Sequence, residues 1–417
     1  MTSVLLEVKD EVHLALLESL GPSLYEENVE VTSLQDRVYE VISVVLESRD
    51  LVLSSYDRAR LVQEVVDEIL GLGPIQSLLR NNEITEIMVN HYDSIFVEQD
   101  GKIHHSDLRF SSEEHLRRTI ERIVANVGRR IDEASPLVDA RLPDGSRVNA
   151  VVPPIALDGA ILTIRKFAAE PFTAEDLIAL GTLTEDAAQF LKSCVAAKLN
   201  VLISGGTGSG KTTTLNVLSS FIPVDERVIT VEDAAELQLA QPHVVRMESR
   251  PVNIEGKGLI TIRDLVRNSL RMRPDRIVVG EVRDGAALDM LQAMNTGHEG
   301  SLTTIHANSS KDALIRIENL VLMAGVDFPI RVIREQISEA IDLIIHQARL
   351  RDGSRKVIAI SEVTGIDVDA VQLQDIFKFT NSTVADNDAV GELVRSGLPI
   401  VKREKFAMRN IKIPRGF

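Results

Sequence analysis

The residues that most clearly predict chemistry form a glycine-rich stretch in the middle of the chain. The stretch fits the pattern G-x-x-x-x-G-K-[ST] and reads Gly205, Gly206, Thr207, Gly208, Ser209, Gly210, Lys211, Thr212, Thr213. Glycines at these places let backbone N–H groups close around a polyphosphate, Lys211 reaches the β- and γ-phosphates, and the Thr212 hydroxyl is a ligand for Mg²⁺. The stretch therefore predicts a nucleoside triphosphate site with bound magnesium.

The flanking residues predict the elements that hold this loop. An apolar run at 199–204 precedes it and is typical of a buried strand. Residues 214–218 follow without Gly or Pro and are typical of a helix. Strand, glycine loop and helix is the context that the motif requires, because the positive end of the helix dipole then faces the phosphates.

Two further apolar runs lead to carboxylates. Glu232 and Asp233 follow the run 227–231, and Glu281 follows the run 276–280. Because α/β proteins bind ligands at the carboxyl ends of strands, these groups could hold magnesium-bound water or orient the attacking water. Gly280 stands where such a strand usually carries an Asp for Mg²⁺, which leaves the metal to Thr212, the phosphates and water. Glu281 is then the candidate general base; solvated surface carboxylates are the alternative.

Two histidines bracket the predicted strand 300–305. His298 and His306 could each sense a γ-phosphate through a hydrogen bond, with a structural role as the alternative. A zinc site is disfavoured because it would need three or four ligands and no cysteine is nearby.

Arginines are unusually dense between the two carboxylate runs. Six lie within 21 residues: Arg263, Arg267, Arg271, Arg273, Arg276 and Arg283. Helical spacing puts Arg263, Arg267 and Arg271 on one face. We expect this cluster to contact other subunits or to stabilise charge during phosphoryl transfer. A nucleic-acid-binding face and a solvated helix face are the alternatives.

The remaining pattern divides the chain into four parts. Residues 1–70 are predicted to be a helical segment, 71–168 a small α/β domain, 173–365 an ATPase-type core and 366–417 a C-terminal extension. Strands alternate with helices in the third part, which is typical of a doubly wound α/β fold. The Asp-Gly-Ser-Arg sequence occurs at 144–147 and at 352–355 and predicts two similar hairpins.

Composition narrows the function classes. The net charge is 46 − 62 = −16, aromatic residues make up 4% and Trp is absent, which argues against a general nucleic-acid binder. The single cysteine, Cys194, is expected to be a core thiol in a reducing compartment. No run of 18 apolar residues is present, so we expect a cytoplasmic protein that could dock on a membrane.

Four motifs in this order resemble the secretion ATPase superfamily of type II and type IV systems. They are the glycine loop, the stretch 230–237, the stretch 271–283 and the stretch 297–308. Within that superfamily the chain most resembles the CpaF/TadA type, which powers assembly of tight-adherence (Flp) pili. The phrases at 71–75 and 149–154 look like that branch, and the four-cysteine zinc motif frequent in the type II branch is absent.

The resemblance implies an α/β fold in which a RecA-like P-loop motor domain follows a small PAS-like α+β domain and an N-terminal helical segment. It implies ATP and Mg²⁺ as cofactors and a homohexameric ring, with ATP at the interdomain cleft. Arginines of the N-terminal domain contact the nucleotide in this family, and the matching candidates here are Arg141, Arg147 and Arg165.

The resemblance also implies a cytoplasmic motor, peripheral at the inner face of the cytoplasmic membrane. Such a motor hydrolyses ATP to drive pilus assembly or secretion through inner-membrane platform proteins, and no stable nucleic-acid partner is expected. A conjugative type IV secretion ATPase is the nearest alternative. A nucleic-acid translocase and a scaffold that binds ATP without hydrolysing it are more distant ones.

Overall fold

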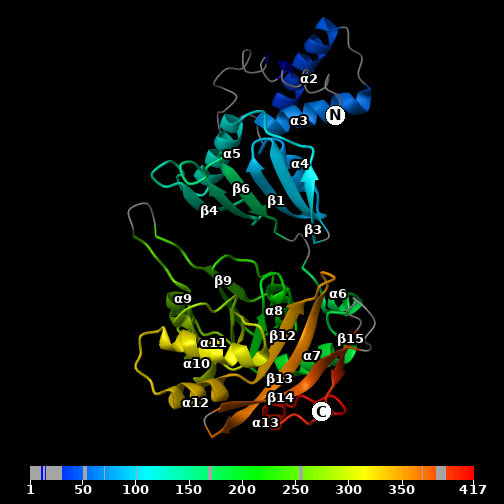
Figure 1. Ribbon diagram of the computed structural model, residues 1–417. Helices are drawn as coiled ribbons and strands as arrows, with labels where there is room; N and C mark the ends of the chain where they lie inside the picture. Colours follow the sequence, from blue (N-terminus) through cyan, green and yellow to red (C-terminus); the bar gives the residue numbers. More distant parts are fainter. Residues whose placement is uncertain are drawn as a thin grey trace. The chain divides into compact units, whose positions relative to one another are not determined.

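The computed structural model describes residues 11–12, 15, 31–49, 54–69, 71–99, 101–167, 171–252, 257–368, 370–381 and 391–417. Its contacts divide the chain into two units, Met1–Ala169 and Glu170–Phe417. Each unit is described by itself, and Figure 1 labels the elements.

The first unit is built on a six-stranded antiparallel sheet with the order β3-β2-β1-β6-β5-β4. Its strands are β1 (Ile84–His91), β2 (Ser94–Gln99), β3 (Lys102–Ser106), β4 (Leu137–Arg141), β5 (Arg147–Val151) and β6 (Ile161–Arg165). Helix α5 (Glu113–Ala125) begins at Ser112, whose hydroxyl accepts a hydrogen bond from the His115 N–H. Its buried side chains, among them Leu116 and Ile120, pack with the inward-facing residues of the strands in one core.

Helices precede this sheet in the chain. They are α2 (Val31–Ser48), α3 (Ser55–Ile69) and α4 (Ile75–Arg80). Arg80 of α4 forms an ion pair with Asp67 of α3, which ties the two helices together. The helical prediction for residues 1–30 lies almost entirely outside the described residues.

The second unit contains a nine-stranded sheet with the order β15-β14-β13-β12-β7-β11-β10-β8-β9. The strands are β7 (Val201–Gly205), β8 (Val228–Glu232), β9 (Val244–Glu248), β10 (Arg276–Val279), β11 (Leu302–His306), β12 (Leu343–Arg349), β13 (Arg355–Asp367), β14 (Ala370–Asn381) and β15 (Gly391–Arg395). The helices are α6 (Ala174–Ala179), α7 (Glu185–Ala196), α8 (Lys211–Ser219), α9 (Ile262–Ser269), α10 (Ala286–Asn295), α11 (Ser310–Leu322), α12 (Ile330–Ala340) and α13 (Arg403–Met408).

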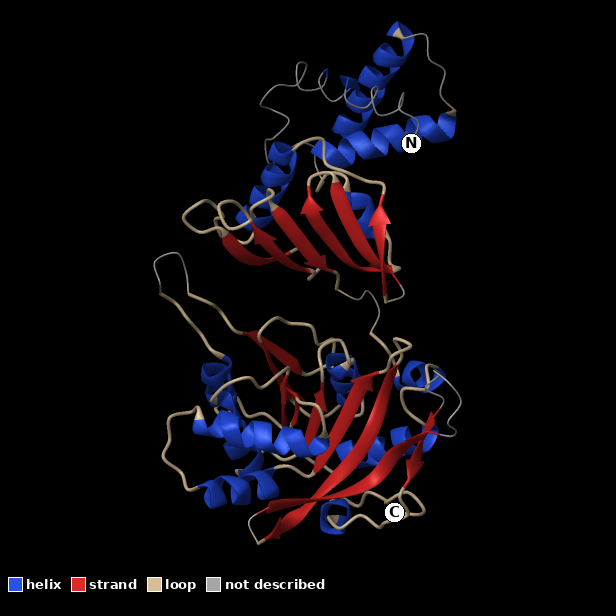
Figure 2. Ribbon diagram, in the orientation of Figure 1, coloured by secondary structure: helices blue, strands red, loops and turns tan. Residues whose placement is uncertain are grey.

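The strands from β12 to β9 run parallel, and β13, β14 and β15 extend the sheet antiparallel. Because successive side chains of a strand point to opposite faces, Val201 and Ile203 of β7 join one core with α7 and α8. Leu202 joins a second core with α9, α10, α11 and α12. Helices therefore cover both faces of the sheet, as Figure 2 shows, and the chain has the α/β fold expected of a RecA-like motor.

The C-terminal extension belongs to this same sheet. It completes β13 and adds β14 and β15, and its last residues return to the first core through Ile400, Phe406 and Phe417. The Phe417 ring stacks on Phe190 of α7 at 4.5 Å between centroids. Residues 366–417 therefore contribute to the core of the second unit.

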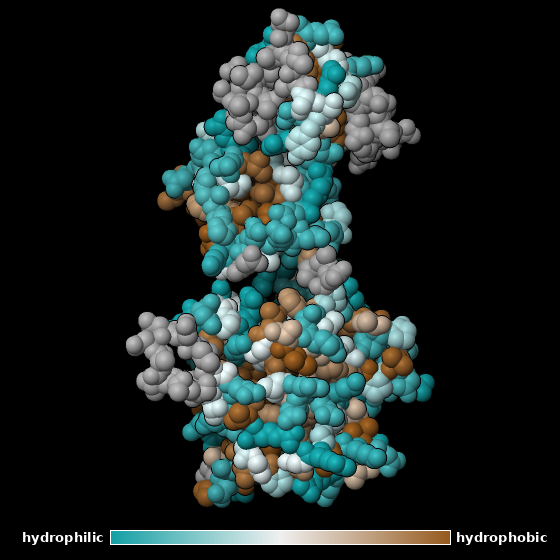
Figure 3. Space-filling model, turned by 90° about the vertical axis from the view of Figure 1, so that its right-hand side faces the viewer, coloured by the Kyte–Doolittle hydropathy of each residue, from teal (hydrophilic) through white to brown (hydrophobic). Residues whose placement is uncertain are grey.

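In the part of the chain that the structure describes, no helix is both long and apolar enough to cross a membrane. On the face drawn in Figure 3, hydrophobic and hydrophilic side chains are interspersed over the second unit.

Candidate active site

The predicted chemical groups of the second unit gather at one edge of its sheet. Since β7, β8, β10 and β11 are parallel, their carboxyl ends meet there. The phosphate loop, residues 205–213, follows β7 and leads into α8. Glu232 ends β8, Glu281 follows β10, and His306 ends β11 opposite Gly205. One edge thus carries the loop, two of the carboxylates and one histidine.

The first glycine of the phosphate loop is required by a close approach. A Cβ on Gly205 would lie 2.3 Å from the backbone oxygen of Gln347 in β12, so no larger residue fits. Below the loop, the Thr214 hydroxyl of α8 donates to Gln347 Oε1 at 2.7 Å. The β12 strand therefore fixes both the start of the loop and the helix behind it.

Lys211 lies at the first position of α8, half-buried beside the loop. Its Nζ donates to the Gly206 carbonyl at 3.0 Å. Burial lowers the pKa of Lys211, Glu281 opposes this shift and Arg283 adds to it. The charges of Lys211 and Glu281 therefore interact, which shows that the two groups lie near one another at this edge.

The candidate base, Glu281, is held by an arginine. Its Oε2 accepts hydrogen bonds from Arg283 Nη2 at 2.6 Å and Nε at 2.9 Å. The same guanidinium lies 3.5 Å from Asp233. Arg283 therefore joins two carboxylates that the sequence assigned to the site, and it could orient Glu281 toward a water molecule.

Glu232 is the most buried of the three carboxylates. Its Oε2 accepts hydrogen bonds from the N–H groups of Glu236 and Leu237, at 2.7 Å and 2.9 Å. Its Oε1 is buried without a hydrogen-bond partner among the described residues. Burial raises the pKa of Glu232, although these two backbone bonds oppose the shift. Such an unsatisfied buried oxygen is a candidate contact for a magnesium-bound water.

The Glu232 side chain also limits the size of the residue that fits at position 280. A Cβ at residue 280 would lie 3.1 Å from Glu232 Cγ, so the Glu232 side chain fills the space beside the strand end. The strand end is fixed on its other side, where the Thr304 hydroxyl of β11 donates to the Gly280 carbonyl at 2.7 Å. Glu232, at the end of the neighbouring strand β8, therefore lies beside the place where standard versions of this strand carry a carboxylate.

The residues present fit a magnesium ion bound chiefly through nucleotide. Over the described ranges, no three His, Cys, Asp or Glu side chains converge on one metal position. Thr212, at the second position of α8, offers a hydroxyl beside the loop. Mg²⁺ keeps several waters and binds through substrate phosphates with few protein ligands, which matches this donor set.

The two histidines lie at opposite ends of β11. His306 ends the strand at the phosphate edge, but His298 precedes the strand by four residues and so lies at the other edge. A direct contact between His298 and a phosphate in the loop of its own chain does not fit this topology. The γ-phosphate sensor role stays a prediction for His306.

Several members of the arginine cluster form ion pairs within the second unit. Arg263 and Arg267 of α9 each donate to the buried Asp289 of α10 at 2.6 Å. Arg276 is fully buried and bonds Glu226 at 2.5 Å, so its role is structural rather than a contact with another subunit. A catalytic role for Arg263 stays a prediction.

In the first unit, the three arginines assigned to the nucleotide form a row across the sheet. Arg141 of β4 is directly opposite Arg147 of β5, which is directly opposite Arg165 of β6. Like charges in directly opposite positions are destabilising. Glu86 of β1 lies directly opposite Arg165 and brings a compensating carboxylate to the end of this row.

Sequence reasoning missed an arginine beside the phosphate loop. Arg355, at the start of β13, donates from Nε to the Gly208 carbonyl at 3.0 Å. Its Asp-Gly-Ser-Arg turn has the same hydrogen bond, Ser N–H to Asp Oδ1 at 2.9 Å, as the turn at 144–147. The similar hairpins were predicted, and the signal overlooked was that each one ends in an arginine.

Comparisons with known proteins agree with this geometry. Residues 68–385 match the family model described as Type II/IV secretion system protein. A protein of Mycobacterium tuberculosis whose name suggests conjugal transfer is 37% identical over 335 residues, which is 79% of this chain and 94% of the relative. The conjugal transfer protein TrbB of Rhizobium radiobacter is 35% identical over 304 residues, 71% of this chain and 88% of the relative.

A solved structure shares the fold. The pilus retraction motor PilT with bound ADP aligns over 81% of this chain and 86% of that chain, with a TM-score of 0.50 and 20% identity. At this identity the likeness concerns the fold alone.

Proposed function

The chain belongs to the type II/IV secretion system protein family and is an ATP-hydrolysing secretion ATPase, and we propose that it powers a type IV secretion machine of the conjugal-transfer class. The observation that carries the ATPase chemistry is the convergence of the phosphate loop, Glu281 and His306 at one sheet edge. The conjugal-transfer class is supported by the names of relatives that match most of this chain.

In the proposed reaction, water attacks the γ-phosphorus in line and ADP leaves. Glu281 accepts the proton of the attacking water, and Lys211 stabilises charge on the β- and γ-oxygens. Thr212 would hold Mg²⁺, which would supply positive charge to the phosphates, and Glu232 and Asp233 would orient water beside it. His306 senses the γ-phosphate.

The arginine row Arg141, Arg147 and Arg165 is proposed to place positive charge on the nucleotide phosphates. This assignment is supported by the register of the sheet, which places the three arginines in directly opposite positions on neighbouring strands. Arg263 is proposed to stabilise the charge that develops during phosphoryl transfer, which requires its ion pair with Asp289 to open.

Assembly of tight-adherence pili is the second candidate function. It is supported by the likeness of residues 71–75 and 149–154 to the CpaF/TadA type. Both candidates imply a homohexameric ring at inner-membrane platform proteins and ATP with Mg²⁺ as cofactors.

The chemistry is tested by ATP turnover of the purified protein, with oligomer mass followed across protein concentrations. Wild type should hydrolyse Mg²⁺-ATP more rapidly per subunit as it assembles. Glu281→Gln should bind ATP and lose turnover by about 10²–10⁴-fold, the usual contribution of a general base. Near-normal turnover of Glu281→Gln would show that another group accepts the proton.

The proposed role in a secretion machine is tested in the host organism. Deletion of the gene should abolish conjugal DNA transfer, and wild type but not Glu281→Gln should restore it. Loss of surface pili with normal DNA transfer would favour the pilus-assembly candidate and contradict the proposal.

A further inference from the structure

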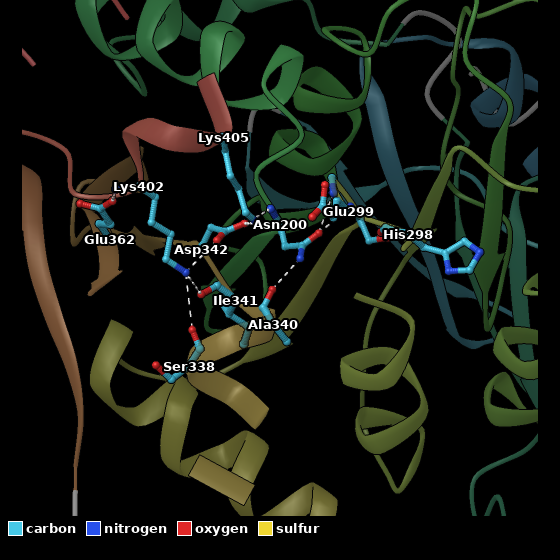
Figure 4. Close-up of polar contacts among 12 residues, drawn as sticks. Asn200, His298, Glu299, Ser338, Ala340, Ile341, Asp342, Glu362, Lys402 and Lys405 are labelled. Atoms are coloured by element: carbon cyan, nitrogen blue, oxygen red, sulfur yellow. Dashed lines mark hydrogen bonds and ion pairs between the residues drawn. The ribbon is translucent and has the colours of Figure 1, made fainter. Parts of the chain in front are cut away.

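Two lysines of the C-terminal extension converge on one buried carboxylate. Asp342 is fully buried, and its oxygens accept hydrogen bonds from Lys402 Nζ at 2.7 Å and Lys405 Nζ at 2.6 Å. Glu362, also fully buried, accepts the N–H groups of Val401 and Lys402 at 2.8 Å. Figure 4 shows both carboxylates and both lysines. Residues 400–409, called the C-terminal clamp below, are therefore fixed to the sheet by buried charge.

Asn200 connects the same carboxylate to the loop that precedes β11. Its backbone N–H donates to Asp342 Oδ2 at 2.8 Å, so this oxygen serves both Asn200 and Lys405. The Asn200 side-chain oxygen accepts the N–H groups of Gly300 and Ser301 at 2.7 Å and 3.0 Å. Asn200 also directly precedes β7, the strand that carries the phosphate loop.

The loop at 297–301, called the histidine loop below, contains two glycines in the left-handed region. Gly297 has φ +94° and Gly300 has φ +82°, and they bracket His298 and Glu299. Arg276 donates to the Gly300 carbonyl at 3.0 Å, so Asn200 and Arg276 fix the second half of the loop. His298 has a buried Nδ1 without a hydrogen-bond partner among the described residues.

The clamp also reaches the tip of this loop directly. Arg409 Nη2 donates to Glu299 Oε2 at 2.6 Å across 110 residues of sequence. Their side chains are 27% and 41% exposed, so this pair lies at the surface and not in the core. Such an exposed pair contributes little to global stability, so its loss should leave the fold intact while it changes the position of the loop.

We propose that the C-terminal clamp is a positioning element for ATP hydrolysis. It holds the histidine loop through Arg409 and Glu299, and the five-residue strand β11 transmits that position to His306 at the phosphate edge. The inference rests on the proposed role of His306. Release of the clamp should lower kcat while ATP binding, made by the distant phosphate loop, is kept.

A charge-swap cycle tests this in the full-length protein. Arg409→Glu and Glu299→Arg should each lower kcat about five-fold, the low end of coupling between linked sites. KM for ATP and the melting temperature should stay near wild type. The double variant restores the pair with reversed charges and should recover most of kcat. The swap of Arg331 and Glu335, an exposed ion pair within α12, is the matched control and should change none of these values.

Hydrogen exchange supplies a second readout that needs no turnover. Peptides covering 297–306 should exchange more rapidly in Arg409→Glu than in wild type and return in the double variant. Unchanged kcat and unchanged exchange in Arg409→Glu would overturn the proposal. A lower melting temperature with proportional loss of kcat and no recovery in the double variant would also overturn it, because it would show a structural role only. A wild type without turnover would refute the proposed function instead, and exchange would then decide whether Arg409 holds the loop.

Discussion

Replacement of Gly300 by alanine should be among the most damaging single-methyl changes in the second unit. The new Cβ would lie 2.0 Å from Arg276 Nη1 and 2.6 Å from Arg276 Cζ. That guanidinium has no free direction to move, because it is fully buried and bonds Glu226, the Val195 carbonyl and the Gly300 carbonyl. The methyl group therefore pushes the buried Arg276 guanidinium away from the partly buried Glu226 as well as straining the backbone.

The cost has two parts. A left-handed φ costs a residue with a Cβ about 1 kcal/mol. Opening the ion pair of the buried Arg276 with Glu226 adds about 3–5 kcal/mol, so the free energy of unfolding should fall by about 5 kcal/mol in total. That is a large share of the stability of an ordinary domain.

Gly297→Ala is the matched control on the same loop. Gly297 has a similar φ, but among the described residues no atom beyond its chain neighbours lies within 4 Å of the place that a Cβ would take, so only the strain of about 1 kcal/mol remains. Chemical unfolding should be followed by far-UV circular dichroism, since the chain has no Trp for fluorescence. Equal shifts of the unfolding midpoint in the two variants would refute the reasoning, because they would show that Arg276 gives way freely.

Three further predictions concern the phosphate edge. Arg355→Met should weaken ATP binding about ten-fold, because it removes a charged hydrogen bond to the phosphate loop. Arg351→Met, on the exposed tip of the same hairpin, is the control. Equal ATP affinities of the two variants by titration would contradict the role of Arg355. Burial raises the pKa of Glu232. The stability that protonated Glu232 contributes is therefore present below the unfolded-state pKa of 4.5 and is lost as pH rises through the folded-state pKa. Wild type should lose stability relative to Glu232→Gln over that pH window, and a constant difference in unfolding free energy between the two proteins would contradict the prediction. Burial lowers the pKa of His346 in β12, although Asp312 opposes the shift. The stability that neutral His346 contributes is therefore present above the unfolded-state pKa of 6.5 and is lost as pH falls through the folded-state pKa. His346→Gln should lack this loss when unfolding is measured from pH 7 downward, and parallel stability curves for the two proteins would refute the prediction.

The sequence predicted the parts of the site that are local in the chain. The strand 199–204, the phosphate loop and the helix predicted from residues 214–218 follow one another within about twenty residues, and the structure has them as β7, the loop and α8. Cys194, predicted to be a core thiol, is fully buried. Periodicity and motif spacing contain this information because it concerns neighbours along the chain.

What the sequence could not provide depends on strand register and on long-range partners. The sequence assigns the same candidate role to His298 and His306, and only the direction of β11 shows that they lie at opposite edges of the sheet. Arg355 reaches the phosphate loop across 147 residues, and Arg409 reaches Glu299 across 110. Charge spacing alone could not tell that Arg276 is buried, since its acidic partner Glu226 lies 50 residues earlier.

The contact between Glu232 and Gly280 has a consequence for how this protein can vary. Two neighbouring strand ends share a single space, and one side chain fills it. An aspartate at 280 would need a smaller residue at 232, and a larger residue at 280 alone would crowd the buried carboxylate. We therefore expect residues 232 and 280 to change together in related sequences. A double variant that replaces Glu232 by a small residue and Gly280 by aspartate should preserve ATP turnover better than either single variant.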